Sequence, residues 1–462
     1  MTDLLRPRYH LMPEKNWMND PNGAIYYNGE YHLFYQHNPH AAEWGDIHWG
    51  HAKSKDLVRW DHLPHALSPS AESGELHCYS GCAVLDGHVP KIFYTSVGSG
   101  ARNAADGAEQ WMAFSTDGMT TWEKAKTNPV LTAASHSPLD IREWRDPFVW
   151  KEDGLWYMVV GGSHEGKGCV LVHRSPDLAG WTYWTMLFRG DDPIFECPNF
   201  FRLGSKWVLI ASPGDRVKHW AGEWNEDGTF TPEQEGIVDF GGWDGYYAPL
   251  TFLCPAGRRL MWGWLPEASR GSFAGITDWA GVMSLPRELI LAEDGTLRFA
   301  PAEETKSLRA LQLTPAGWTL ESGLWRTGIR GRALEIAVSF RPSEACGRFG
   351  LKLLHSPSFE EESVLVFDCQ NNRFSLDRAK SSLAEEPRRS AIEGDFVYAP
   401  GEDLQVRLFV DHSLVEVFVN ESHCLTGRIY PLRADSDGVS VFAEQPGRVE
   451  ISDFQAWELS ME

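Results

Sequence analysis

The sequence lacks an excess of positive charge. Its 462 residues include 42 Lys and Arg against 64 Asp and Glu, which gives a formal net charge of −22. Nucleic-acid binding requires a basic face toward the phosphates, and attachment to anionic lipid requires a polybasic segment. The composition therefore argues against nucleic acid and membranes as partners.

The sequence also lacks a long hydrophobic run. No stretch approaches the roughly 18 apolar residues of a membrane-spanning helix, and residues 1–17 show neither the apolar core nor the cleavage site of a signal peptide. The eight cysteines are scattered without a CxxC pair, which favours reduced, mostly buried thiols over a disulfide framework. We therefore expect a cytoplasmic protein and leave its oligomeric state open.

Metal-site spacing is missing as well. Several histidines cluster near the N-terminus, but they form no HExxH arrangement and have no matching carboxylate pattern. They are His32, His37, His40, His48 and His51. We predict no metal ion at these residues.

Tryptophan, in contrast, is abundant and unevenly distributed. Of the 21 tryptophans, 18 precede residue 280. A turn-rich segment at 290–305 lies where this composition changes, so we predict two domains, residues 1–300 and residues 301–462. The second alternates apolar and polar residues as strands do, which favours a β-sandwich that supports the first domain. Sugar binding by this second domain is the alternative.

Two patterns repeat along the first domain. A Ser-x-Asp motif followed by tryptophan begins at Ser54, Ser115 and Ser175, at intervals of 61 and 60 residues. A turn glycine before a short apolar, aromatic run occurs at a mean interval of 57 residues, at Gly29, Gly87, Gly154, Gly204 and Gly257. Such runs are typical of strands, and this repeat length favours small sheets arranged as blades. We predict an all-β fold with a five-bladed β-propeller; a β-sandwich with evenly spaced turns is the alternative.

Each of the five glycines follows a polar side chain by 7 to 10 residues. Because the first strand of each blade lines the centre of a propeller, nearly equal offsets would place these side chains on one rim. They are Asp20, Ser80, Asp146, Glu196 and Tyr247, and proline follows four of them directly or one residue later. We therefore predict that three carboxylates meet in one tryptophan-rich pocket.

Such carboxylates can hydrolyse a glycosidic bond when one stays ionised and another donates a proton to the leaving oxygen. Glu196 has apolar sequence neighbours that would raise its pKa, which makes it the acid candidate. Asp20, in the turn sequence NDPNG, is the nucleophile candidate. Arg145 favours an ionised Asp146, which could bind sugar hydroxyls and stabilise an oxocarbenium-like centre. Flat faces for sugar rings are expected from Trp17, Trp44, Trp49, Trp262 and Trp264.

Taken together, the motifs resemble glycoside hydrolase family 32, the β-fructofuranosidases, which include invertases, inulinases, levanases and fructan exohydrolases. The resemblance covers nearly the whole chain. It rests on NWMNDPNG at 16–23, HLFYQHNP at 32–39, WGDIHWGHAKSKDLVRW at 44–60, YSGCAV at 79–84, WRDPFVW at 144–150, ECPNFF at 196–201, WDGYYAPLTF at 243–252, RRLMWGW at 258–264, WAGVMSLPREL at 279–289 and LFVDHSLVEVFVN at 408–420.

The resemblance implies a five-bladed propeller followed by a C-terminal β-sandwich, hydrolysis with retention, and no metal or organic cofactor. By residue-by-residue match it implies that Asp20 is the nucleophile, Glu196 the acid/base and Asp146 the transition-state stabiliser. It also implies a fructose subsite formed by Asn19, Gln36, Trp44, Tyr79, Ser80, Arg145, Tyr247 and Trp264. Three positions beside this subsite, His37, Cys82 and Leu250, depart from the family's usual residues and leave the leaving-group preference open.

We therefore expect an exo-acting enzyme that removes the terminal β-D-fructofuranosyl unit of a small sugar, sucrose or a short fructo-oligosaccharide. A fructosyltransferase or a hydrolase specific for fructans or difructose is the alternative within the family. Outside it, the alternatives are a carbohydrate-binding propeller without catalysis and an inverting pentosidase on a related propeller. Retention predicts carboxyl groups of Asp20 and Glu196 about 5–5.5 Å apart.

Overall fold

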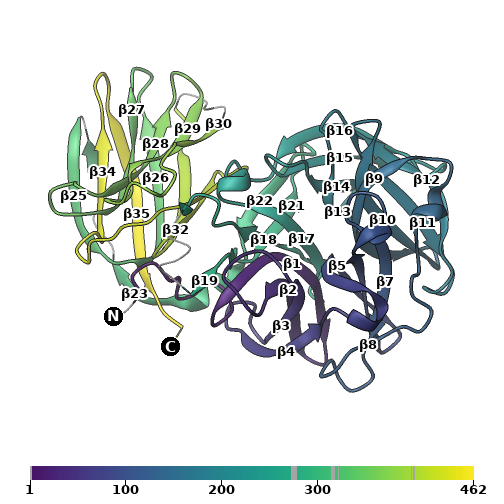
Figure 1. The fold of residues 1–462 in the computed structure, drawn as a ribbon. Helices are drawn as coiled ribbons and strands as arrows, with labels where there is room; N and C mark the ends of the chain where they lie inside the picture. The colour runs from purple at the N-terminus through teal and green to yellow at the C-terminus, as the bar shows by residue number, and fades with distance from the viewer. Residues whose placement is uncertain are drawn as a thin grey trace.

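A computed structural model describes residues 3–461 except 272–277, 314–317, 321, 397 and 399–400. Strands predominate in these residues, and they form two groups that lie next to each other (Figure 1). The helices described are short 3-10 turns: η1 (Ala71–Ser73), η2 (Gly100–Arg102), η3 (Ala133–His136), η4 (Gly242–Asp244) and η6 (Glu303–Leu308). None of the described helices has the length and apolarity needed to cross a bilayer.

The described residues of the first group form five sheets, each built mainly from strands that follow one another along the chain. The first sheet contains β1 (Asn16–Tyr27), β2 (Glu30–Asn38), β3 (His48–Ser54) and β4 (Asp61–Leu67) with β19 (Trp279–Ala280), and the second contains β5 (Glu75–Asp86), β6 (Val89–Gly98), β7 (Glu109–Phe114) and β8 (Glu123–Lys124). The third contains β9 (Ile141–Glu152), β10 (Leu155–His164), β11 (Lys167–Ser175) and β12 (Thr182–Arg189), and the fourth contains β13 (Glu196–Leu203), β14 (Lys206–Ser212), β15 (Lys218–Trp224) and β16 (Phe230–Ile237). The fifth contains β17 (Tyr247–Leu253), β18 (Arg259–Leu265), β21 (Arg287–Leu291) and β22 (Leu297–Pro301) with β20 (Val282–Met283).

The first strands of these sheets form a ring. Neighbouring first strands contact each other in the cycle β1, β5, β9, β13, β17 and back to β1, which is the arrangement of a propeller. One short segment closes the ring, because β19 pairs in parallel with β1 while β20 pairs with β18 of the last sheet. The all-β fold class and its propeller are confirmed.

The repeated sequence patterns are the turns of this propeller. Each of the five predicted glycines lies between the first and second strands of its sheet with φ between 57° and 90°, a region that favours glycine. In each Ser-x-Asp motif the serine hydroxyl donates to the aspartate two residues later, at 2.9–3.1 Å, where the third strand ends. Both patterns are therefore structural.

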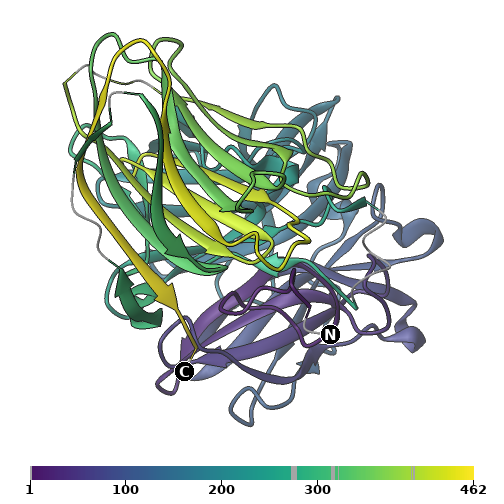
Figure 2. The ribbon, with the colours of Figure 1, turned by 90° about the vertical axis from the view of Figure 1, so that its left-hand side faces the viewer.

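The second group is a two-sheet sandwich, seen in front of the propeller in Figure 2. One sheet contains β23 (Arg309–Leu313), β24 (Trp318–Leu320), β26 (Ala333–Pro342), β31 (Leu404–Asp411), β32 (Leu414–Val419), β33 (His423–Arg428) and β35 (Val449–Leu459). The other contains β25 (Gly323–Arg330), β27 (Arg348–His355), β28 (Glu362–Asp368), β29 (Arg373–Lys380), β30 (Ile392–Asp395) and β34 (Gly438–Ala443). Alternate apolar side chains of both sheets form a separate buried core. The division predicted at residue 300 falls within the last residues of β22 and stays a prediction.

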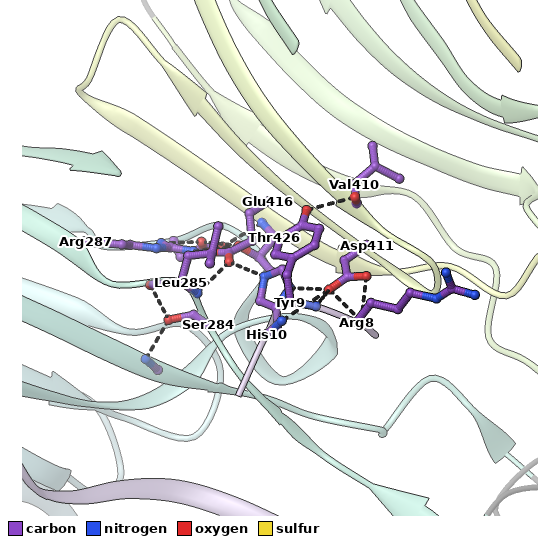
Figure 3. Close-up of polar contacts among 12 residues, drawn as sticks. Arg8, Tyr9, His10, Ser284, Leu285, Arg287, Val410, Asp411, Glu416 and Thr426 are labelled. Carbon is purple, nitrogen blue, oxygen red and sulfur yellow. Dashed lines mark hydrogen bonds and ion pairs between the residues drawn. The ribbon is translucent and has the colours of Figure 1, made fainter. Parts of the chain in front are cut away.

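A buried polar network joins the sandwich to the propeller (Figure 3). Glu416 of β32 accepts hydrogen bonds from Arg287 of β21 at 2.6 Å and from the Leu285 backbone at 2.9 Å. His10 lies between Glu416, at 3.0 Å, and Asp411, at 2.8 Å. Burial would raise the pKa of Glu416, but Arg287 and His10 outweigh it and lower this pKa to about 2. The two domains are thus held together by charges with no access to water.

All eight cysteines are free thiols, as predicted, and six of them are buried.

Candidate active site

A β-bulge interrupts every inner strand of the propeller at the same depth. In each pairing of a first with a second strand, two residues of the inner strand stand opposite one residue of its neighbour. A bulge re-aims the side chains beside it, and proline is tolerated there because no ladder N–H is needed. The bulges contain or border the five residues predicted to share one rim: Asp20, Ser80, Asp146, Glu196 and Tyr247.

Three of the bulges hold a non-glycine residue in the left-handed region. The φ angles are +65° at Asp146, +47° at Cys197 and +48° at Ala248. Such conformations are strained and persist where the surrounding structure imposes them, often at functional sites. The strain therefore falls on the residues that border the predicted pocket.

Asp20 lies at the centre of a hydrogen-bond network. Its Oδ2 accepts from the Ser80 hydroxyl at 2.5 Å and from the Gln36 amide at 3.2 Å, and its Oδ1 accepts from Asn19 at 3.1 Å. Asn19 also donates to Gln36 at 2.8 Å. Burial raises the pKa of Asp20, and the hydrogen bonds from Ser80 and Asn19 partly counter this. These contacts fix the orientation of the carboxylate.

Asp146 is the more strongly perturbed carboxyl group. Its Oδ2 accepts the Cys197 backbone N–H at 2.8 Å, and the Cys197 thiol lies within 3.6 Å of both Asp146 and Asp20. Burial raises the pKa of Asp146 to about 7; the charge of Arg145 lowers it and that of Asp20 adds to the rise. Arg145 favours the ionised form, as expected from the sequence, but desolvation outweighs its charge and the net shift is upward.

Glu196 lies between a cation and a phenol. Its Oε1 accepts from Arg145 at 2.6 Å and its Oε2 accepts from the Tyr247 hydroxyl at 2.6 Å. Arg145 also binds Glu143 at 2.7 Å. The apolar setting inferred from the sequence neighbours of Glu196 is therefore wrong, because both polar partners come from other strands.

These groups line one pocket of about 350 Å³, within the size range of small-ligand sites. All three predicted catalytic residues line it, and so does every residue of the predicted fructose subsite except Ser80, which is buried and donates to Asp20. Tyr79 and Trp44 form part of the wall with ring centroids 6.1 Å apart, and burial raises the pKa of Tyr79 to about 12.

Trp243 also lines the pocket and was not singled out from the sequence. It is 45% exposed and packs edge to face on Tyr247 at 4.9 Å and on Trp264 at 5.6 Å, while Trp264 contacts Trp17. The available sequence signal was a tryptophan in the glycine-rich segment shortly before Tyr247. The rings form a continuous aromatic wall against which a sugar can stack.

Two other expectations about the pocket are wrong. Trp49 and Trp262 are buried in the propeller core and do not belong to the lining. Of the three unusual positions, His37 is buried and binds the Trp17 carbonyl at 2.7 Å, whereas Cys82 and Leu250 line a different pocket. None of these three side chains borders the catalytic pocket.

Metal-ligand geometry occurs elsewhere. In the part of the chain that the structure describes, His40, Asp46 and His48 bring three potential ligand atoms within 4.8 Å of one another. Two of these side chains are exposed, and none lines the pocket. His32 and His51 form a separate hydrogen-bonded pair at 2.9 Å.

Three carboxyl groups in an aromatic pocket at the centre of a propeller define a carbohydrate-cleaving active site of the glycosidase type. The comparisons with known proteins agree. Residues 10–301 match the model of the glycosyl hydrolases family 32 N-terminal domain, and residues 301–458 match that of the family 32 C-terminal domain. The chain belongs to glycosyl hydrolase family 32 and is a glycoside hydrolase.

Its relatives cover both domains. Sucrose-6-phosphate hydrolase of Escherichia coli is 32% identical, over 98% of this chain and 94% of that protein. A variant of fructan 1-exohydrolase IIa from Cichorium intybus in complex with 1-kestose is 28% identical, with a TM-score of 0.90, over 100% of this chain and 98% of that one. A mutant of a Bombyx mori β-fructofuranosidase in complex with sucrose is 29% identical, with a TM-score of 0.81, over 99% and 95% of the two chains.

Proposed function

We propose that this protein is a retaining, exo-acting β-fructofuranosidase that hydrolyses sucrose or short fructo-oligosaccharides. The observation that carries the proposal is the convergence of Asp20, Asp146 and Glu196 in one aromatic pocket. Relatives whose names refer to sucrose and to fructan support the fructoside as substrate class.

In the proposed reaction Asp20 attacks C2 of the fructosyl unit while Glu196 protonates the departing glycosidic oxygen. The product is a fructosyl ester of Asp20. Glu196, now ionised, takes a proton from water, which attacks C2 and releases fructose and the Asp20 carboxylate. Asp146 binds hydroxyl groups of the fructosyl ring and stabilises the positive charge that develops in the transition state.

The pocket favours a neutral sugar. Arg145 is the cation among its described lining residues, and both Glu143 and Glu196 already bind its guanidinium. A phosphorylated sugar would bring a dianion beside three carboxyl groups, which raises the electrostatic energy of binding. We therefore expect a higher kcat/KM on sucrose than on sucrose 6-phosphate.

Asp20→Ala tests the chemistry. Release of glucose and fructose from sucrose should fall by at least about 10³-fold because the nucleophile is lost, while Asp191→Ala, at an exposed ion pair with Lys167, should leave the rate unchanged. If wild-type protein releases no fructose from sucrose, sucrose is not its substrate. A large residual rate in Asp20→Ala would assign the nucleophile elsewhere.

Stereochemistry and mode of attack need their own assays. With methanol as acceptor, retention yields methyl β-D-fructofuranoside, whereas an inverting enzyme yields the α-anomer. Exo-action on inulin releases fructose alone, and endo-action would release oligosaccharides. Analysis of products at high sucrose concentration distinguishes hydrolysis from fructosyl transfer, since a transferase would accumulate 1-kestose or a related trisaccharide.

A cytoplasmic location is part of the proposal. It is supported by the free state of all eight cysteines, which is typical of reducing compartments. Fractionation of the source cells tests it, and recovery of the activity outside the cytoplasm would refute it.

A further inference from the structure

A second pocket, of about 340 Å³, lies at the other end of the five inner strands. Each strand contributes residues to both pockets: β9, for example, places Asp146 in the first and Trp150 in the second, and β13 places Glu196 and Phe201 in the same way. A constriction between them, bordered by the bulge prolines, has only about 10 Å³ of free volume. The second pocket is therefore a separate site.

The charge of the second pocket is opposite to that of the first. The catalytic lining carries three carboxyl groups and one cation. The described lining of the second pocket carries three cations, Lys151, Arg202 and Arg259, against one carboxylate, Glu152. This local excess of positive charge is unusual in a chain with a net charge of −22.

Arg259 of β18 is the central group. Its guanidinium lies over the Phe201 ring, 4.3 Å from the centroid, and its Nε is buried without a hydrogen-bond partner. Within the described residues no carboxylate pairs with it, whereas the adjacent Arg258 binds both Glu288 and Glu304. Burial lowers the pKa of Arg259 to about 10, so the group stays charged at neutral pH. The residue as a whole is half-buried, and a partly shielded charge without an acidic partner is uncommon in proteins because desolvation opposes it.

Two further polar groups of this lining have no partner. The Trp150 indole Nε1 and the Thr251 hydroxyl are both buried without a hydrogen bond in the described part of the protein. An indole N–H and a guanidinium N–H can only donate, and a threonine hydroxyl can donate as well. Buried polar groups are nearly always satisfied in native proteins. All three groups belong to residues that line this pocket and can donate to a bound acceptor, and an oxyanion, with several acceptor atoms, suits them best.

We propose that this pocket binds a small organic molecule through a phosphate or carboxylate group, which Arg259, Trp150 and Thr251 hold. The Arg259 guanidinium supplies charge-assisted hydrogen bonds, and Trp150 and Trp207, which also line the pocket, contact the body of the ligand. The site is distinct from the catalytic pocket: it takes an anionic ligand, whereas the catalytic pocket favours a neutral sugar.

Thermal unfolding and calorimetric titration of the full chain test the proposal. The probes are inorganic phosphate, glucose 6-phosphate and gluconate, each at constant ionic strength against chloride. At least one should raise the Tm and bind in the millimolar range or tighter; a response to both phosphates identifies a phosphate site, and a response to gluconate alone a carboxylate site. Arg259→Gln should weaken binding at least about tenfold, whereas the control Arg202→Gln, at an exposed arginine of the same rim, should change it less than about threefold.

Two further measurements distinguish this site from the catalytic pocket and from a structural role of the arginine. Saturating fructose should not displace the anion, and Arg259→Gln should retain the wild-type rate on sucrose. Arg259→Met should raise the Tm of the ligand-free protein, because a partly buried charge without a carboxylate partner is removed, and should abolish the Tm rise with ligand.

Three results would overturn the proposal. They are no binding of any probe, equal affinity in wild type and Arg259→Gln, and displacement of the anion by fructose. A lower Tm of ligand-free Arg259→Met would assign the arginine a purely structural role.

Discussion

Replacement of Asp146 by asparagine should abolish activity and stabilise the fold, increasingly so as the pH rises. In the folded protein, burial raises the pKa of this carboxyl group from its usual 3.8 to about 7. The asparagine amide has nearly the same shape, and its carbonyl can still accept the Cys197 N–H. The substitution therefore removes the buried charge with little change in packing.

The direction of this pH dependence follows from the number of protons that the folded and unfolded states bind. Between pH 3.8 and about 7 the unfolded chain has released a proton that folded Asp146 still holds, so the free energy of unfolding falls as the pH rises. Below this range both states are protonated and the effect disappears. From the two pKa values, the stability advantage of Asp146→Asn is about 2 kcal/mol at pH 5 and about 4 kcal/mol at pH 8.

Urea unfolding followed by tryptophan fluorescence measures this difference, since 18 of the 21 tryptophans precede residue 280 and report on the propeller. Asp117→Asn is the matched control. Hydrogen bonds from Thr121 lower the pKa of exposed Asp117 to about 2, so its stabilising contribution is lost only below pH 3.8 and its variant should show no such trend between pH 5 and 8. An advantage of Asp146→Asn that stays constant or shrinks toward pH 8 would refute the argument.

Two further substitutions test the domain interface and the aromatic wall. Glu416→Leu removes the buried carboxylate that Arg287 and His10 share and leaves each with one, Asp239 and Asp411 respectively. We expect a loss of about 3 kcal/mol in the free energy of unfolding; calorimetry measures it, and a loss below about 1 kcal/mol would contradict a structural role for the network. Trp243→Ala removes a sugar-stacking face, so KM for sucrose should rise about tenfold with a smaller change in kcat, and Trp243→Phe should restore most of the affinity. Equal KM values in wild type and Trp243→Ala would place the sugar elsewhere.

The sequence predicted the propeller and the shared depth of the catalytic residues because both follow from a repeat. A turn glycine marks where each inner strand ends, and a fixed distance back from it reaches the same depth in every sheet. Asp20 and Glu196 could therefore be brought together although 176 residues separate their positions in the sequence. In such a repeat, residues at equal distances from the turn glycine lie at equal depths along the propeller axis.

What the sequence could not predict depends on contacts between different sheets. Glu196 has apolar sequence neighbours, but Arg145 and Tyr247, which bind it, come from the sheets on either side. Trp262 and Trp264 lie on the same face of β18, yet they pair with Leu250 and Tyr247 respectively, so only Trp264 reaches the depth of the pocket. Nothing in the sequence indicated that Arg259 lines a pocket, since a charged residue at the start of a strand usually faces solvent.

The bulge prolines have a consequence for the accuracy of strand pairing. If an inner strand slid by one residue against its neighbour, the side chains beside the bulge would exchange faces. In four of the five strands, proline occupies the bulge or the residue directly after it, so a shifted ladder would lack an N–H at that point. In the remaining strand Gly81 occupies this place, where a Cβ atom would lie 1.9 Å from the Phe93 carbonyl oxygen, so a shift that brought Ser80 or Cys82 to this point would clash. A pairing shifted by one residue is thus destabilised at the point where the shift would turn a carboxylate away from the sugar.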